Sequence, residues 1–497
     1  MGRYSFGDGG GAVDFAALLA FASILLAAFA IARPVQRRSL GLFVSAWPLI
    51  IAFLISLSLL ICRDAPFGVK PPFGWSLSVV QFSLTLGAFL VLIAAAVWCW
   101  ITWHRGKLTD RNIGRVEGVF TAALREREFD EVERIVRKNQ RGLERLPSDA
   151  ASVLFNRAMV ASLVDAHPLL HLELLSEIRF LKSLENRSAA VDAVVRELLR
   201  SSVSPLRSAV VSRYGGLEHL KYTEAESRLM EATFQNPEWY LEARAHYPLV
   251  ISAVGALRTG AYDAVYNSIG RDYEARQGTS ARSNCPVYLA AKTEVLAIEA
   301  AIRKRSGADF YVSDLCDIFR SVLERSQFKN DVWENPLGNR EFPTPYAYLL
   351  YEITADLRHL SERAVGEAMC DATPPTVEPP SRIAQDLAQC WSFCLWVIAD
   401  SVGRVSPDFR RDIIKQYLLF ILELGWQPSE ISFRLAHVAD GLQTWRDLFL
   451  GELRARFRGD RVERVNALRG AMGSLDQGKR HVSEGYSWLE ASLTETI

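Results

Sequence analysis

Three long apolar runs lie close together in the first hundred residues of the chain, at positions 15–32, 42–62 and 77–103. A helix needs about 20 residues to cross the hydrocarbon core of a bilayer, and each run has about that length or more. None of the runs contains Asp, Glu, Lys, Arg or His. The sequence therefore predicts three membrane-spanning helices. The lipid bilayer is accordingly one predicted partner of the chain.

Basic residues flank these runs unevenly. The connection after the first run is strongly basic, whereas the second connection, residues 63–76, contains only Arg63, Asp64 and Lys70 as charged residues. The segment after the third run is basic again. Because basic segments stay on the cytoplasmic side, we expect the N-terminus outside and everything after residue 103 in the cytoplasm. The residues that carry this argument are Arg33, Arg37, Arg38, Arg105, Lys107, Arg111 and Arg115.

The first run resembles a retained anchor more than a cleaved signal peptide. Its basic cluster follows the apolar stretch, which is the reverse of the signal-peptide order. Cleavage after Ala30 or Ala32 stays open as an alternative. Lys is scarce while Arg and Ala are abundant, which favours a GC-rich bacterial source and therefore a bacterial inner membrane.

The remainder of the chain has the pattern of an all-α protein. Apolar residues recur at helical spacing, and few alternating β-branched runs interrupt them. We expect a cytoplasmic helical domain at 104–370, a C-terminal helical subdomain at 382–470 and a polar, loosely held tail at 471–497, after the three-span anchor at 1–103. The proline-rich segment 371–381 is the best candidate for a boundary.

Several helix starts are predicted from local signals. Thr223 and Glu226 form a capping box, Pro286 opens a long Ala-rich helix, and Ser148 with Asp149 can cap a helix that continues to Leu163. No fixed repeat period is found. The sequence leaves open whether the helices form an irregular bundle or an irregular solenoid.

The cysteines do not predict a disulfide framework. All of those beyond the membrane runs would face a reducing cytosol, so we expect all seven to be free thiols. Cys390 and Cys394 stand four residues apart among aromatic residues, where buried small thiols are the ordinary interpretation. His167 and His171 have the same spacing, but no third ligand is evident, so no metal site is assigned.

One motif resembles a phosphate-binding loop and fails on inspection. Residues 473–479 match its glycine and lysine spacing, but Arg480 replaces the Ser or Thr that would hold magnesium. No hydrophobic strand precedes it. We therefore expect no catalytic residue and no cofactor, and the chain is predicted to be non-enzymatic. The weaker alternative is an enzyme whose active site matches no motif recognised in the sequence.

A long polar and aromatic loop is predicted at residues 326–345. It contains Trp333, Glu334, Arg340 and Glu341 and is longer than an ordinary connection. Exposed tryptophan beside paired charges is typical of protein contact surfaces. These four residues are the candidate partner contact, and a loop folded back on its own domain is the alternative.

These observations support two hypotheses of different kinds. The first is an inner-membrane protein whose helical domain docks or senses a protein partner. The second is a membrane effector of a cell-suicide or phage-defence system, which permeabilises the membrane when triggered. The formal net charge of +0 gives no basic excess for nucleic acid. A stripe of small residues on the first run would allow a homo-oligomer: Ala16, Ala20, Ser23 and Ala27.

Overall fold

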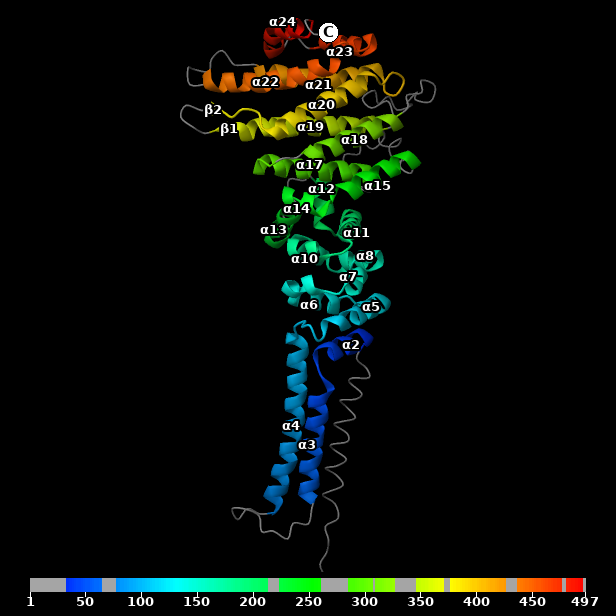
Figure 1. Ribbon diagram of the computed structural model, residues 1–497, viewed down its shortest axis with the longest axis vertical. Helices are drawn as coiled ribbons and strands as arrows, with labels where there is room; N and C mark the ends of the chain where they lie inside the picture. The colour runs from blue at the N-terminus through cyan, green and yellow to red at the C-terminus, as the bar shows by residue number, and fades with distance from the viewer. Residues whose placement is uncertain are drawn as a thin grey trace, which may run out of the picture. The chain divides into compact units, whose positions relative to one another are not determined.

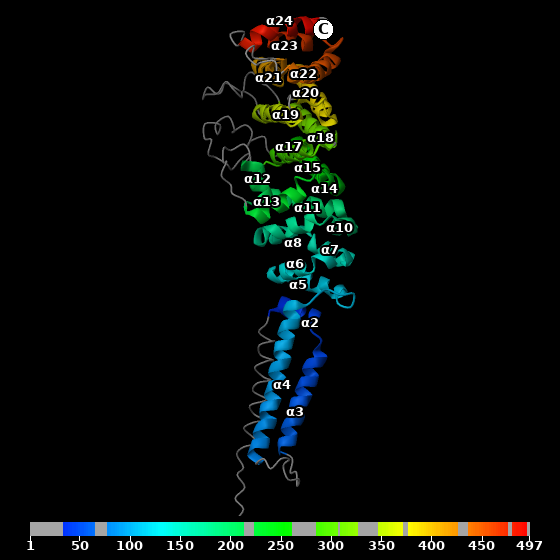
Figure 2. The same cartoon turned by 90° about the vertical axis from the view of Figure 1, so that its left-hand side faces the viewer.

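The computed structural model of the chain is helical in nearly every part that it describes (Figures 1 and 2). The all-α class is therefore confirmed. The described residues are 33–64, 77–212, 223–260, 285–306, 309–326, 346–370, 376–425, 436–475 and 480–494.

The chain divides into two compact units. Unit 1 contains Met1–Leu170 and Arg179–Glu185, and unit 2 contains His171–Ile178 and Asn186–Ile497. The domain limits expected from the sequence, including the boundary at residues 371–381, stay predictions.

In unit 1, two long helices lie side by side: α3 (Ala46–Asp64) and α4 (Leu77–Arg105). By length and composition α4 is long and apolar enough to cross a membrane. Helix α3 passes the same test only together with α2 (Pro34–Phe43), from which it is bent by 86°. The predicted first span, residues 15–32, lies outside the described residues. One long apolar helix is therefore clear, and three spans stay a prediction.

The α3–α4 pair turns large apolar side chains outward. Phe82 is 68% exposed and Trp100 is 60% exposed. Between the helices, Ser56 donates a hydrogen bond to the carbonyl of Ala88 (3.0 Å), and Arg63 donates one to Thr85 (3.3 Å). These polar side chains of the two apolar helices therefore serve contact between them.

The basic first connection is itself helical, although no helix is predicted there from the sequence. Arg37 and Arg38 lie on α2, and Leu42 and Phe43 belong to this helix rather than to the second span. Pro34 at the first helical position favours this start, because its missing N–H would have no partner there in any case.

Short helices follow α4 in unit 1. The helix expected from Ser148 to Leu163 is broken in two, because the Asn156 side chain accepts a hydrogen bond from Ala158 N (3.0 Å) and so caps a new helix. Ser148 is a helical residue rather than a cap. The elements are η2 (Ile113–Arg115), α5 (Val116–Glu126), α6 (Asp130–Lys138), η3 (Gln140–Arg145), α7 (Ser148–Leu154), α8 (Arg157–Ala166) and, at the border with unit 2, α9 (Pro168–Ser176) and α10 (Ile178–Ser183).

Unit 2 begins with short helices, and its helices from α17 to α22 have 17 to 22 residues. From α17 to α21 each helix packs against the next and also against the next but one, which is how stacked helix pairs pack. The helices are α11 (Arg187–Arg200), α12 (Pro205–Ser212), α13 (Glu224–Thr233), α14 (Pro237–Ala243), α15 (His246–Thr259), α17 (Pro286–Lys304), α18 (Asp309–Arg325), α19 (Ala347–Ala368), α20 (Arg382–Ala399), α21 (Pro407–Gly425), α22 (Ala436–Phe457), α23 (Val462–Gly473) and α24 (Arg480–Thr494).

Two predicted helix starts in unit 2 are confirmed. Thr223 and Glu226 form the reciprocal hydrogen bonds of a capping box, and α17 begins at Pro286 as expected. The segment expected to be a loosely held tail contains α24, whose Leu489 is fully buried. In the sequence, the apolar residues of this helix are interspersed with the polar residues of its other face, so the segment has the composition of a polar tail.

A small antiparallel pair joins α19 to α20, where no strand was expected. Its strands are β1 (Met369–Cys370) and β2 (Thr376–Val377). Helix α22 approaches it closely, since a Cβ at Gly441 would lie 2.5 Å from the Val377 Cβ. Only glycine allows this contact.

Candidate functional site

The sequence-predicted contact residues are not among those that the structure describes. Trp333, Glu334, Arg340 and Glu341 all lie within 327–345, outside the described residues. Their role in partner contact stays a prediction.

A polar joint in unit 1 connects the end of α4 to α2 and α6. Arg134 on α6 donates hydrogen bonds to the Trp103 carbonyl (2.8 Å) and to Ser39 Oγ (2.9 Å), and it is paired with Glu131 (2.6 Å). Ser39 is fully buried, accepts from the Trp103 indole (3.0 Å) and donates to Glu131 (3.3 Å). The Arg134 guanidinium also lies over the Phe43 ring. One side chain therefore holds three segments together.

Further contacts strengthen this joint. Lys138 on α6 donates to the His104 carbonyl, and Arg38 on α2 donates to the Gly118 carbonyl (2.9 Å). Cations at the final carbonyls of α4 satisfy groups that a helix end leaves without internal partners. The last turn of α4 is thus fixed to α6.

In unit 2, a buried set of ionisable groups lies between α17 and α19. Lys292 donates to Asp356 (2.5 Å) and to Glu352 (2.9 Å), and both Lys292 and Asp356 are almost completely buried. Tyr348 donates to the second oxygen of Glu352 (2.6 Å). Buried charges need such partners, because an isolated charge in the interior is very costly.

A second buried set lies where α14, α15, α17 and α18 meet. Tyr240 donates to Glu294 (2.9 Å), and the Tyr311 ring packs edge-on against Tyr240 with 5.1 Å between ring centroids. Burial, with the nearby charge of Asp314, raises the pKa of Glu294 well above its ordinary value. Burial and the neighbouring Asp317 raise the pKa of Asp314 to about 7. This set can hold protons at neutral pH.

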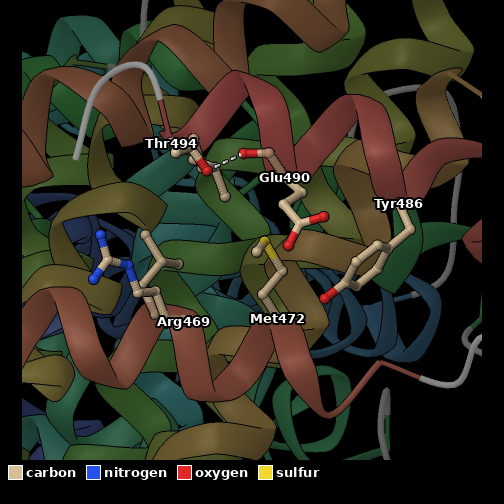
Figure 3. A pocket seen from close by; sticks show the side chains of 7 residues that line it. Arg469, Met472, Tyr486, Glu490 and Thr494 are labelled. Atoms are coloured by element: carbon tan, nitrogen blue, oxygen red, sulfur yellow. Dashed lines mark hydrogen bonds between the residues drawn. The ribbon is translucent and has the colours of Figure 1, made fainter.

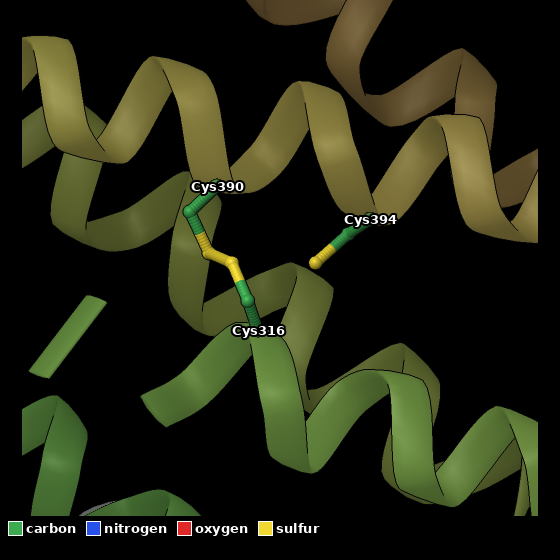
Figure 4. A group of neighbouring side chains, drawn as sticks. All are labelled: Cys316, Cys390 and Cys394. Atoms are coloured by element: carbon green, nitrogen blue, oxygen red, sulfur yellow. A yellow bond between two sulfur atoms is a disulfide. The ribbon is translucent and has the colours of Figure 1, made fainter. Parts of the chain in front are cut away.

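Three cysteines meet between α18 and α20. Cys316 on α18 forms a disulfide with Cys390 on α20, and Cys394 points toward that disulfide from one turn further along α20 (Figure 4). The expectation of free thiols is therefore wrong for Cys316 and Cys390. Packing of α18 on α20 brings together residues 74 positions apart, which spacing along the chain cannot reveal.

A cavity of about 230 Å³ lies between α23 and α24 (Figure 3). Its walls combine the carboxylate of Glu490 and the ring of Tyr486 with Met472 and Arg469. Ligand pockets usually measure about 300–1,000 Å³, so this cavity is small for an organic ligand. It does not define a site.

The histidine pair and the phosphate-loop-like motif, the two weaker sequence motifs, form no site in the described residues. His167 caps the end of α8 and contacts Glu133 (2.8 Å), whereas His171 is completely buried, which lowers its pKa to about 3. The two do not belong to the metal-compatible group found among the described residues, which consists of cysteines. Of the phosphate-loop-like motif, Gly473 is the last residue of α23, and residues 476–479 lie outside the described part.

Sequence reasoning missed the buried Lys292 although a signal was present. Helix α17 is apolar or small on all sides except for a few charged residues, and such helices are buried. A lysine inside one requires a carboxylate partner. Which carboxylate it meets was not readable, since Asp356 lies on a different helix.

No protein-family model matches the chain, and no curated protein matches it. Among solved structures, the chain is similar to a circular tandem repeat protein with a novel repeat topology and enhanced subunit contact surfaces. The identity is 15%, the match covers 94% of this chain and 98% of the other, and the TM-score is 0.25.

Proposed function

We propose that the chain is a non-enzymatic membrane protein whose helical region docks or senses a protein partner and passes that event to α4. The joint at Arg134 carries this proposal. A passive tether needs only a flexible linker, whereas Arg134 fixes the last turn of α4 to α2 and α6 at once. A fixed joint lets a movement of the helical region reach the membrane helix.

Membrane insertion is supported by the outward-facing apolar side chains of α4. A contiguous apolar surface of this kind is unfavourable in water and favourable in lipid. The basic flanks support an outside N-terminus and a cytoplasmic helical region, and the composition supports a bacterial inner membrane. Both parts of this localisation are included in the proposal.

Docking is supported by the packing of unit 2. Stacked helix pairs present extended surfaces, which solenoid-like proteins use to bind partners. The segment predicted to be a loop, with Trp333 and Arg340, would supply an aromatic and a charged anchor for such a partner.

A membrane effector is the second candidate, and the same joint favours it. If the helical region senses a trigger, the contacts of Arg134 would transmit it to α4. The outward apolar faces of α3 and α4 could then pack against further copies of the chain.

A capture experiment tests docking. The full chain in lipid nanodiscs is used as bait, and bound proteins are quantified for the wild type, Trp333→Ala/Arg340→Ala, and the control Val462→Ala, an exposed residue of α23. A genuine partner is lost from the double variant and retained by the control. A partner that binds all three equally would remove the loop from the proposal.

Overproduction separates the two candidates. A docking protein should leave the membrane potential of cells unchanged, whereas an effector should depolarise them. If depolarisation occurs and Arg134→Ala abolishes it at equal protein level, the effector replaces the docking protein as the proposed function.

The orientation is tested by thiol labelling in spheroplasts. Cys62 is exposed, but Cys285 is buried and would resist labelling on either side of the membrane. Val402→Cys, at a position 68% exposed, is the better cytoplasmic probe. An impermeant reagent should label Cys62 before lysis and the thiol introduced by Val402→Cys only after it. Labelling in the opposite order would contradict this orientation and indicate the reverse one.

A further inference from the structure

We propose that Cys316, Cys390 and Cys394, when reduced, form a three-thiolate site for one monovalent copper ion. The sulfur atoms of all three lie within 4.8 Å of one another. Three sulfurs at about 2.3 Å from a central ion would be about 4 Å apart, so small side-chain rotations suffice. Soft thiolates are the ligands that monovalent copper prefers.

The ligands have the burial expected of a metal site with an entry path. Cys390 and Cys394 are buried on one face of α20, one turn apart, whereas Cys316 on α18 is partly exposed. An ion can therefore enter past Cys316 and be enclosed by the other two. The site joins two helices, as structural metal sites do.

The charges around the cluster favour three thiolates with a monovalent ion. Arg320 and Arg456 both lie over the ring of Phe393, the neighbour of Cys394, with 4.6 Å and 5.4 Å to its centroid. Three thiolates with one monovalent cation retain two negative charges. Arg456 and Arg320, which is also 3.9 Å from Asp317, lie close enough to offset part of that charge.

Zinc fits the cluster less well. Structural zinc is almost always held by four ligands. Among the described residues, the metal-compatible group has three members and no fourth histidine, cysteine or carboxylate. A three-sulfur set is complete for monovalent copper and incomplete for zinc.

The disulfide and the copper site exclude each other. A thiol reductant gives two electrons and two protons to the Cys316–Cys390 bond and releases two thiols. Binding of the ion then displaces one proton from each of the three cysteines. In the oxidised protein two of the three sulfurs are bonded to each other, so the trigonal set is absent.

The test is a competition titration with the full chain in detergent under anaerobic conditions. Reduced wild type, oxidised wild type, Cys394→Ala, Cys316→Ala and the control Cys285→Ala receive monovalent copper in the presence of a copper-specific chelator. Cys285 is also buried but lies outside the cluster. Circular dichroism confirms that each variant is folded.

We expect one copper per chain in the reduced wild type and in Cys285→Ala. Binding should be at least tenfold weaker in the cluster variants and in the oxidised protein. X-ray absorption of the loaded protein should show three sulfur neighbours at about 2.3 Å. Equal binding by oxidised and reduced protein would overturn the proposal without relying on any variant. Retention of zinc in preference to copper, or two-sulfur coordination, would overturn it as well.

Discussion

Helices α4 and α17 differ in which side chains they expose and which they bury. In α4 large apolar side chains such as Phe82 and Trp100 face outward, whereas in α17 the ionisable side chains of Lys292 and Glu294 face inward. The first arrangement is favourable in an apolar surrounding such as the proposed membrane, and the second requires partners inside the protein. Both helices therefore depart from the usual arrangement of apolar side chains inside and polar side chains outside. Each departure indicates which surroundings favour the helix.

The largest expected effect is at Lys292. Lys292→Met leaves Asp356 buried without its cation, and breaking a buried pair costs about 3–5 kcal/mol. Chemical denaturation of the full chain in detergent measures the loss of unfolding free energy. The control Lys304→Met, at the exposed end of the same helix, should stay within about 0.5 kcal/mol.

A double variant sharpens this prediction. Lys292→Met/Asp356→Leu removes both buried charges, so it should be more stable than Lys292→Met alone. If the double variant is less stable than the single, the buried pair contributes net stability and the contrast with α4 becomes smaller.

The next effect concerns α4. Leu90→Lys places a charge on its outward face, which should cost about 3 kcal/mol for insertion at the centre of a spanning helix. Membrane fractionation and protease protection measure the inserted fraction. Val402→Lys, equally outward-facing but in unit 2, should leave that fraction unchanged. Full insertion of Leu90→Lys would contradict a lipid-facing position for this surface.

Another effect is predicted from pH. Asp314 titrates near 3.8 when unfolded and at about 7 in the folded protein, because burial and Asp317 disfavour its charge. Its contribution to stability is therefore full below pH 4 and is lost as the pH rises toward 7. Asp314→Asn should flatten this decline, as measured by denaturation across the range. Unchanged slopes would show that Asp314 is not protonated in the folded state.

The smallest effect is expected at Ser56, whose hydroxyl bonds to Ala88 between α3 and α4. Hydrogen bonds between membrane helices average about 0.6 kcal/mol, so Ser56→Ala should destabilise the pair by roughly that amount. Unfolding in mixed detergent measures it. A loss as large as that of Lys292→Met would mean that the two regions do not differ in how they depend on polar contacts.

The sequence by itself determined the local features. The apolar run that becomes α4, the capping box at Thr223 and the proline start of α17 were all readable, because each depends on residues within a few positions of one another. The break at Asn156 and the short strands after α19 were missed, since both override the local apolar periodicity.

Only the tertiary structure decided which distant groups meet. Lys292 pairs with Asp356, Cys316 with Cys390, and Arg134 with the end of α4, and in each case the partner lies on another helix. Helical periodicity reports which face of a helix is buried but not which helix covers it. Docking of helices sets these pairs, and it depends on packing over the whole surface rather than on any motif.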